Sequence, residues 1–400
     1  MEELKGRFAA EASIASTSFL ADDHYLIRWL KARKFDVDEA EAMLRNHLRF
    51  RLALKMDLAE YRSWTPNRLL RDYYTRSLFG HDKCGRPIVY YTFGKIDTEG
   101  LSRSVRTSDT MNASMFWQEE IHWRFEEASK QFKRRITQAL YVFDLKGIGT
   151  GHLYKPGLDV FQQMCKYAEQ HAPEIMYKVL VINAPAIFYL FYKLISPILD
   201  EVTKNKVHVF GADGWKEELL ELVDSNELPV YYGGAAVGKN GDPKCSDSIC
   251  YGGKVPKSEL FTNRYPKPNR LLNLENIHMA RGEQVLKRFS VNEEECGKLL
   301  FWYLASSSSS DVGFGVYYSG KMSLKDSEIH DDVTRMTMLF PYYRVLTHSV
   351  PETNSIVLDK PGTYAVLLDN SYSWFSGKSV QLHASIESPS SALIGQFCFD

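Results

Sequence analysis

Val179-Leu180-Val181-Ile182-Asn183-Ala184-Pro185 joins four consecutive aliphatic residues to an asparagine and a proline. A short aliphatic run that ends in such breakers is typical of a strand. Helical spacing of apolar residues comes before and after this strand, and the alternation continues to residue 223. Strands alternating with helices predict an α/β layer with a mostly parallel sheet. The strands are expected at 87–93, 139–143, 179–182 and 207–210, and the helices at 108–132, 158–169, 186–199 and 215–223.

Ahead of this layer the sequence predicts a small helical bundle. Asp36 is a candidate N-cap with a Glu three residues on, and leucines recur at every fourth residue from Leu44 to Leu52. Residues 22–34 show the same spacing, with basic residues towards their end. The chain from there to about residue 74 is also expected to be helical.

After the layer, residues 233–269 hold a dense series of glycines and prolines, which predicts a linker or an ordered arm. The remaining pattern is one of short strands separated by turn residues. Tyr364, Val366 and Leu368 alternate with their neighbours after a Pro-Gly turn, so an all-β sandwich is expected. Its strands are predicted at 283–291, 298–304, 313–318, 355–358, 364–368 and 380–386.

Composition and charge exclude several classes of protein. The chain has 400 residues, of which 44% are hydrophobic and 25% charged, as in ordinary globular proteins. Lys and Arg number 49 against 50 for Asp and Glu, so the basic excess of a nucleic-acid binder is missing. Because no secretory leader and no apolar run of ~20 residues is evident, we expect a cytoplasmic protein that contacts membranes peripherally.

Signatures of catalysis and of cofactor binding are missing from the sequence. There is no GxSxG elbow, Walker A loop or HExxH motif, and the six cysteines form no CxxC pair. The sequence Gly147-Ile148-Gly149-Thr150-Gly151-His152 follows a strand but has His152 where a dinucleotide loop needs its third glycine. We therefore assign no catalytic residue, no metal site and no cofactor.

The segment from Ile187 to Leu199 is apolar almost all around, although a helix that covers a sheet should show one polar face. Two interpretations fit this pattern. The helix is either a core element that is buried on every side, or a lid whose outer face meets membrane or lipid.

Several separated motifs resemble one known family. Arg28-Trp29-Leu30-Lys31-Ala32-Arg33-Lys34-Phe35-Asp36 is similar to the N-terminal helical module of CRAL-TRIO lipid-binding proteins. Markers of that family follow in the expected order, at Gly85-Arg86-Pro87, Phe143-Asp144-Leu145-Lys146-Gly147, Val181-Ile182-Asn183-Ala184-Pro185 and Leu228-Pro229-Val230-Tyr231-Tyr232-Gly233-Gly234. In the C-terminal third, Asp311-Val312-Gly313-Phe314-Gly315-Val316 and Leu368-Asp369-Asn370-Ser371-Tyr372-Ser373 resemble a GOLD domain, which is a β-sandwich.

This resemblance implies an α/β CRAL-TRIO lipid-binding fold with an N-terminal helical bundle, followed by an all-β sandwich. The implied boundaries are 1–75 for the helical module, 76–234 for the lipid-binding domain, 235–270 for a linker or arm and 271–390 for the GOLD domain. The family also implies a pocket for one lipid that a mobile helix closes, here called the gate. Its lipid-facing residues would be Ile187, Phe188, Leu190, Phe191, Leu194 and Ile198.

Family members that bind phosphatidylinositol hold its headgroup with an Arg, a Glu, a Thr and a Lys. These positions match Arg33, Glu174, Thr203 and Lys206. Two cations can hold a phosphodiester while the other two groups meet inositol hydroxyls. The alternative is structural, because Arg33, Glu174 and Lys206 could form a salt-bridge network that ties the N-terminal helices to the sheet.

Members that bind phosphatidylcholine use hydroxyl groups at positions that Ala139 and Tyr141 occupy here, and a headgroup tyrosine falls on Val89. This departure argues against choline lipids, whereas tocopherol-like or squalene-like ligands need only an apolar pocket.

The leading hypothesis is therefore non-enzymatic binding and transfer, or presentation, of phosphatidylinositol or an isoprenoid between membranes. The alternative is a trafficking scaffold on Golgi, ER or endosomal membranes, with protein partners on the GOLD domain and lipid as a signal.

Overall fold

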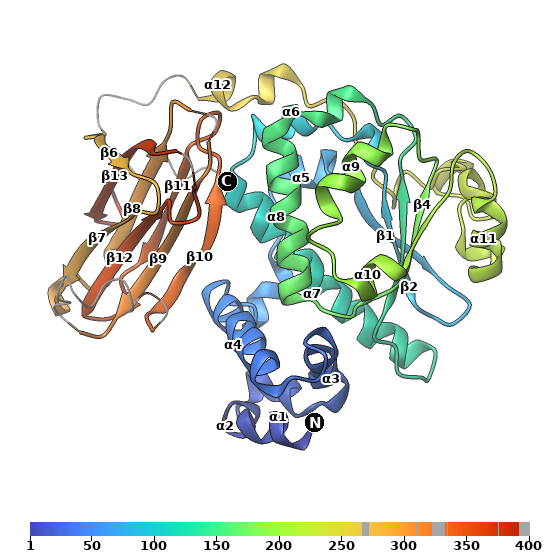
Figure 1. The fold of residues 1–400 in the computed structure, drawn as a ribbon, viewed down its shortest axis with the longest axis horizontal. Coiled ribbons are helices and arrows are strands. Elements are labelled where there is room, and N and C mark those ends of the chain that lie inside the picture. The colour runs from blue at the N-terminus through green and yellow to red at the C-terminus, as the bar shows by residue number, and fades with distance from the viewer. Residues whose placement is uncertain (266–271, 309, 322–332, 334, 375, 392–400) are drawn as a thin grey trace. The chain divides into compact units, whose positions relative to one another are not determined.

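The computed structural model describes residues 1–265, 272–308, 310–321, 333, 335–374 and 376–391, which form two compact units (Figure 1). The first unit contains residues 1–44, 66–101 and 112–256, and the second contains residues 45–65, 102–111 and the chain from 257 onwards. Two long helices, α4 (Val37–Ala53) and α7 (Thr107–Gln131), each give one end to each unit.

A five-stranded sheet in the order β1-β2-β3-β4-β5 forms the centre of the first unit. β1 is antiparallel to β2, and the other neighbouring pairs are parallel, so the predicted mostly parallel sheet is confirmed. The strands are β1 (Arg76–His81), β2 (Pro87–Tyr91), β3 (Ala139–Asp144), β4 (Met176–Ile182) and β5 (Val207–Val209).

Three helical crossovers join the parallel strands. They are α7, α8 (Lys155–His171), and α9 (Phe188–Ile195) with α10 (Glu201–Asn205). Because the strands follow one another in space in sequence order and such crossovers are right-handed, all three lie on one face of the sheet. Ile121 and Phe125 of α7 and Phe188 of α9 accordingly share an apolar cluster with Tyr141 of β3. α11 (Trp215–Leu222) covers the opposite face.

The buried carboxylate of Asp144, at the end of β3, connects three of the sequence motifs. Its Oδ1 accepts from the backbone N–H of Lys146 at 3.0 Å and from Asn183 Nδ2 at 2.8 Å, and its Oδ2 accepts from the Tyr232 hydroxyl at 3.3 Å. Asn183 has a left-handed backbone with φ of 54°, which asparagine tolerates better than most residues. The last residue of β3 thus holds the end of β4 and the segment around Tyr232.

The N-terminal helices of the first unit begin and end close to the predicted positions. Asp36 Oδ1 accepts from the Glu39 N–H at 3.0 Å, which confirms the predicted N-cap of α4. The expectation of a helix up to residue 74 is only partly right, because Pro66 separates a 3-10 turn at Ala59–Ser63 from α5. The helices are α1 (Glu2–Arg7), α2 (Ala9–Ala12), α3 (Asp23–Ala32), α5 (Arg68–Tyr73) and α6 (Thr98–Ser102).

The second unit contains α12 (Phe261–Arg264) and the predicted β-sandwich. Its two antiparallel sheets have the orders β10-β9-β12-β7 and β11-β8-β13-β6. Trp302 of β8 contacts Phe314 of β9 and Phe340 of β10 in the other sheet, at centroid distances of 5.7 and 5.2 Å. The strands are β6 (Glu275–Met279), β7 (Gln284–Val291), β8 (Leu299–Ala305), β9 (Val312–Ser319), β10 (Thr337–Val345), β11 (Glu352–Val357), β12 (Gly362–Asp369) and β13 (Lys378–Glu387).

Three strands, β1, β6 and β10, are absent from the sequence prediction, and each of them is an edge strand. An edge strand faces solvent on one side and carries a weaker apolar pattern. β10 even contains Pro341, which only an edge strand or a bulge tolerates.

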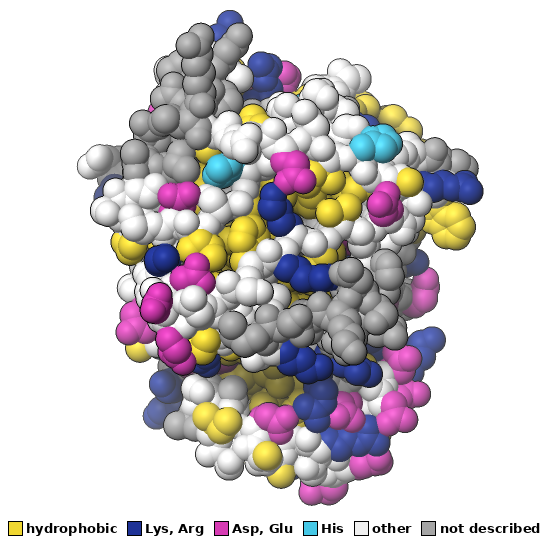
Figure 2. Space-filling view, turned by 90° about the vertical axis from the view of Figure 1, so that its left-hand side faces the viewer, with side chains coloured by type: hydrophobic (Ala, Val, Ile, Leu, Met, Phe, Trp, Pro, Cys, Tyr) yellow, Lys and Arg dark blue, Asp and Glu magenta, His cyan; other side chains and the backbone are white. Residues whose placement is uncertain are grey.

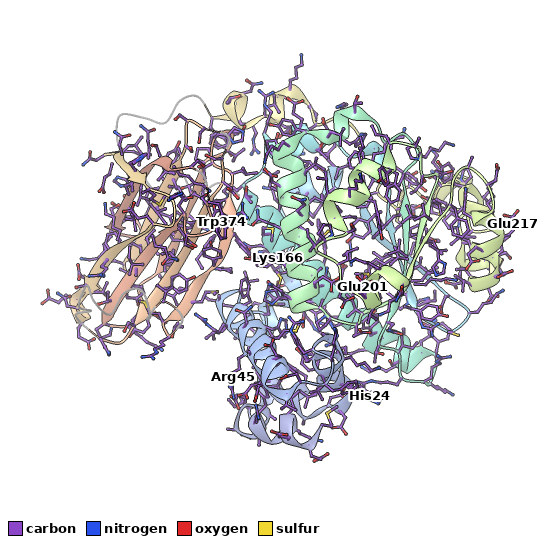
Figure 3. The ribbon with its side chains drawn as sticks, viewed as in Figure 1. His24, Arg45, Lys166, Glu201, Glu217 and Trp374 are labelled. Atoms are coloured by element: carbon purple, nitrogen blue, oxygen red, sulfur yellow. The ribbon has the colours of Figure 1, made fainter. Side chains whose placement is uncertain are left out.

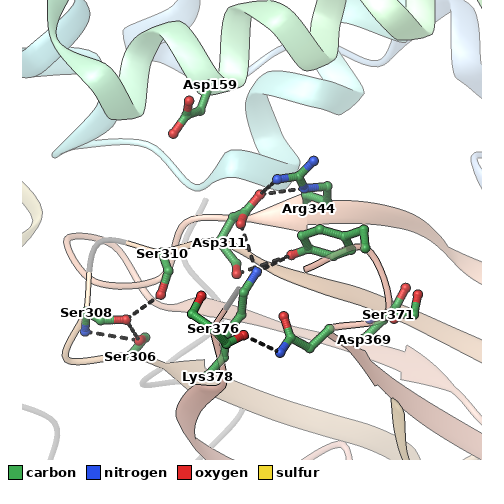
Figure 4. A network of polar contacts seen from close by, with 12 residues as sticks. Asp159, Ser306, Ser308, Ser310, Asp311, Arg344, Asp369, Ser371, Ser376 and Lys378 are labelled. Atoms are coloured by element: carbon green, nitrogen blue, oxygen red, sulfur yellow. Dashed lines mark hydrogen bonds and ion pairs between the residues drawn. The ribbon is translucent and has the colours of Figure 1, made fainter. Parts of the chain in front are cut away.

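The two C-terminal motifs of the sandwich meet in a polar network (Figure 4). Lys378 Nζ donates to Asp311 Oδ1 at 3.0 Å and to the Tyr372 hydroxyl at 2.8 Å, and Arg344 pairs with Asp311 Oδ2. On the face that Figure 2 shows, basic and acidic side chains lie next to one another.

The predicted linker is ordered over residues 235–256, which pack within the first unit. The Tyr231 N–H donates to the Pro243 carbonyl at 2.8 Å, and Ile249 is buried in the apolar cluster under α11. Residues 257–265 belong to the second unit, and residues 266–270 lie outside the described residues.

Gly234 provides a test of this packing. A Cβ at this position would lie 2.0 Å from the Leu228 carbonyl oxygen, so Gly234→Ala should lower the free energy of unfolding by about 1–3 kcal/mol in a urea titration. Gly149→Ala is the matched control, because nothing lies within 4 Å of its Cβ. Equal losses in both variants would contradict the close approach.

Candidate functional site

The crossover from β4 to β5 carries the predicted gate at one end and the predicted headgroup residues Thr203 and Lys206 at the other. It starts after Ile182, at the carboxyl end of β4, and returns to the amino end of β5, where the Lys206 carbonyl accepts from the Val179 N–H at 2.9 Å. α9 and α10 are its two helices. Glu201, the first residue of α10, marks this region in Figure 3.

No residue of α9 is buried, although its sequence is almost entirely apolar. Leu190 and Leu194 are 49% and 38% exposed, and Tyr189 is also exposed, so the interpretation as a core helix is wrong. Phe188 alone of these side chains packs against the apolar cluster on the sheet. The helix is also shorter than the predicted 186–199, because Pro197 lacks the N–H that a further turn needs.

The other predicted gate residues, Ile187, Phe191 and Ile198, are half-buried. α9 is joined to α8 by a hydrogen bond from Gln162 Nε2 to the Leu194 carbonyl at 2.8 Å. With an inner anchor at Phe188 and an apolar outer face, the helix lies on the sheet without being enclosed by the protein.

The sheet face beneath α8 and α9 is incompletely covered. Phe93 contacts Phe143 at 5.5 Å and Phe161 of α8 at 5.4 Å, measured between ring centroids. All three rings are only half-buried, although they lie on the inner side of the sheet or of its covering helix. Accessible aromatic surface of this kind is what an apolar ligand would cover.

Glu174 and Lys206 form the centre of the predicted headgroup site. Lys206 Nζ lies 3.0 Å from Glu174 Oε2, and both side chains are largely buried. Glu174 has a left-handed backbone with φ of 60°, and its carbonyl accepts from Gln138 Nε2 at 3.3 Å. Thr203 lies one turn before Lys206, where its N–H donates to the N-cap Asp200. The structure therefore brings Glu174, Thr203 and Lys206 into one region.

Arg33 does not contact these residues. Among the described residues, its side chain hydrogen bonds to the Ala32 carbonyl, at 3.0 Å. Of the predicted salt-bridge network, the Glu174–Lys206 pair is therefore present and the link to Arg33 is not.

Glu169 on α8 is a member of the site that the sequence prediction missed. Burial raises its pKa to about 7, and Asp200 adds to the rise, whereas Thr203 and Lys206 oppose it. Its Oε1 is enclosed and has no hydrogen-bond partner among the described residues. A signal existed in the sequence, because Phe161, Cys165 and Glu169 follow at a spacing of four, and a carboxylate is unexpected on such a stripe.

Among the described residues, no group of three His, Cys, Asp or Glu side chains is placed to hold a metal ion. None of the described helices combines the length and the hydropathy that crossing a membrane requires.

An α/β layer with an exposed apolar helix over a half-covered aromatic face defines a lipid-binding class of domain. In agreement, the family model described as CRAL/TRIO domain matches residues 71–234, and the CRAL/TRIO N-terminal domain matches residues 1–46. The chain belongs to the CRAL-TRIO family of lipid-binding proteins.

One curated relative is Protein ctg-1 of Caenorhabditis elegans, which is 31% identical over 367 residues that cover 92% of each chain. Among solved structures, that of Sfh5 covers 60% of this chain and 80% of its own at 16% identity, with a TM-score of 0.41.

The position of Glu169 predicts a pH-dependent stability. Its pKa is higher in the folded protein than the value of 4.5 that applies to an unfolded chain, so folding loses stability as the pH rises from about 4.5 to about 7. Glu169→Gln imitates the neutral acid, so the variant should unfold at a higher temperature than the wild type at pH 8, with the gap closing at pH 4.5. Glu201→Gln, which changes an exposed carboxylate, should show no such gap. If the difference in unfolding temperature between Glu169→Gln and the wild type stays constant with pH, the raised pKa of Glu169 is contradicted.

Proposed function

We propose that the chain binds one hydrophobic ligand and transfers it between membranes, or presents it there, without catalysing a reaction. The observation that carries this proposal is the apolar outer face of α9, on which Tyr189, Leu190 and Leu194 are exposed, above a sheet face with accessible aromatic rings. A bilayer is a partner that would cover such a face, and movement of α9 would open the sheet to lipid.

The ligands proposed are phosphatidylinositol and a tocopherol-like or squalene-like lipid. For phosphatidylinositol, Lys206 would contact the phosphate, and Glu174 and Thr203 would meet inositol hydroxyls. Arg33 would supply the second cation after its segment approaches the bound headgroup. For the isoprenoid, the order of motifs followed by a β-sandwich resembles supernatant protein factor, also called tocopherol-associated protein.

The test is to incubate the purified full chain with vesicles that contain phosphatidylinositol, α-tocopherol and squalene, re-isolate it, and identify the bound molecule by mass spectrometry. About one lipid per chain is expected. A chain that stays empty would contradict lipid transfer and favour the scaffold hypothesis.

Lys206→Ala separates the two ligand classes in the same assay. It should lower bound phosphatidylinositol at least tenfold and leave squalene unchanged, because only the headgroup loses a partner. The control is Lys178→Ala, which breaks a similarly buried ion pair with Glu218. Equal loss of both ligands in Lys206→Ala would assign the Lys206–Glu174 pair a structural role instead.

A double substitution tests membrane contact by α9. Phe188 is unsuitable because it also packs on the sheet, whereas Leu190 and Leu194 are exposed. Leu190→Asp with Leu194→Asp should reduce the vesicle-bound fraction severalfold in a flotation assay, because charge is costly in a bilayer. Leu220→Asp on α11, at a position with 37% exposure, is the control. Unchanged flotation of the folded double variant would exclude this role for α9.

The second candidate function is a trafficking scaffold on Golgi, ER or endosomal membranes, in which the sandwich acts as a GOLD domain that binds proteins. The observation in its favour is Trp374, which lies in the second unit next to the Tyr372 network and is 80% exposed (Figure 3). Tryptophan is enriched among residues that anchor protein interfaces.

A further inference from the structure

The end of α7 and the turn that follows it carry a concentration of positive charge, and we call residues 130–135 the basic turn. Their sequence is Lys130-Gln131-Phe132-Lys133-Arg134-Arg135, with four cations and no carboxylate, in a chain whose formal net charge is -1. All six residues are exposed. Charge gathered at one place in an otherwise balanced protein gives that place a positive potential, which attracts an anionic partner.

Three of the four cations are free to bind a partner. Arg135 pairs with Asp22, the N-cap of α3, whereas Lys130, Lys133 and Arg134 form no ion pair with any residue that the structure describes. A cation in the last turn of a helix, such as Lys130, is favoured by the helix dipole. Lys133 and Arg134 lie beyond the end of α7, so the helix dipole does not account for them.

Hydrogen bonds hold the backbone of the basic turn. The Arg134 N–H donates to the Ser129 carbonyl at 3.2 Å, and the Ile136 N–H donates to Ser129 Oγ at 2.9 Å. Lys133, just before Arg134, has a left-handed backbone with φ of 50°. Because the backbone is already ordered, binding would fix side chains only, which lowers the entropy cost of association.

An aromatic ring lies in the middle of the basic turn. Phe132 is 38% exposed, and one side of its ring packs on the β1–β2 turn, where a Cβ on Gly85 would lie 2.6 Å from Phe132 Cγ. The His81 ring of β1 lies 5.2 Å from the Phe132 ring, measured between centroids. Cations around a partly exposed aromatic ring are typical of surfaces that bind in the headgroup region of a membrane.

The position of the basic turn separates it from α9. Because β3 and β4 are parallel, the basic turn, which precedes Ala139, lies at the amino end of the sheet, whereas α9 follows the carboxyl end of β4. Gln138, three residues after Arg135, donates from Nε2 to the Glu174 carbonyl at 3.3 Å. A partner of the basic turn would therefore meet the end of the sheet that carries the Glu174–Lys206 ion pair.

We propose that the basic turn binds the anionic surface of a membrane. Lys130, Lys133 and Arg134 pair with the charged headgroups of acidic phospholipids, and the exposed edge of the Phe132 ring meets the boundary between headgroups and acyl chains. This inference rests on the proposed function, since it names the kind of membrane that the chain visits. The contact is electrostatic and lies at the other end of the sheet from the start of α9, so salt should weaken it.

Flotation of the full chain on two kinds of vesicle tests this inference. One kind is phosphatidylcholine alone and the other contains about one-third phosphatidylserine, and the ratio of the two bound fractions is compared. The wild type should favour the acidic vesicles about tenfold or more at low salt, and the preference should fall as salt is added. Lys133→Gln with Arg134→Gln should lower the ratio at least about fivefold, because each cation near an acidic surface contributes about fivefold.

Three further variants act as controls in the same assay. Lys133→Arg with Arg134→Lys keeps both charges and should keep the ratio. Lys216→Gln with Lys239→Gln removes two exposed cations from elsewhere in the first unit and should also keep it. The variant with Asp at residues 190 and 194 of α9 should lower both bound fractions and leave their ratio unchanged.

The outcomes distinguish this inference from the function on which it rests. Equal flotation of the wild type on both vesicles, or equal losses in the two glutamine variants, would overturn the inference alone. Retention of the wild type on a polyglutamate resin, without a preference for acidic vesicles, would overturn it in favour of an acidic protein partner. A chain that floats on neither vesicle and takes up no lipid would overturn the proposed function as well. Because the wild-type ratio is informative by itself, the test does not depend on the folding of any variant.

Discussion

The buried carboxylate of Asp144 is the interaction on which the first unit depends most. It accepts hydrogen bonds from the turn after β3, from Asn183 at the end of β4 and from Tyr232 beyond α11. A buried carboxylate is costly unless several donors satisfy it, so these segments can only be arranged together. α9 begins five residues after Asn183. The base of the exposed helix is therefore fixed by a satisfied polar contact, while its outer residues have none that would enclose them.

The right-handed crossovers determine which face of the sheet the helices cover. Because all three crossovers cover one face, that face receives a helical layer, and α9 in the last crossover has only eight residues, none of which is buried. The opposite face is closed by α11, Tyr232 and Ile249. The Glu174–Lys206 ion pair lies at the amino ends of β4 and β5, whereas α9 follows the carboxyl end of β4.

Much of the fold could be predicted from the sequence, and there is a physical reason for each element that was missed. Central strands such as 179–182 are buried on both faces and show it as aliphatic runs, whereas β1 and β6 lie at sheet edges and lack such runs, and Pro341 interrupts the apolar run of β10. Within the site, Glu174, Thr203 and Lys206 were indicated by the family resemblance alone, and the structure brings them into one region. Arg33 directly follows α3, far from these residues in the sequence, so no local pattern predicts its distance from them. The raised pKa of Glu169 depends on the burial of its carboxylate, which only the three-dimensional packing reveals.

The division of α4 and α7 between the two units has a consequence for how this protein can be dissected. Arg49 of α4 donates to the Met336 carbonyl, and Ser108 of α7 donates to Glu352 at 2.6 Å, all within the second unit. A fragment that stops at residue 256 would keep these helix ends and remove the strands that they contact. The chain therefore has no single cleavage point that yields two intact halves. A truncated form could lose activity because its helix ends are damaged or because the sandwich is missing. Point substitutions in the sandwich avoid this ambiguity.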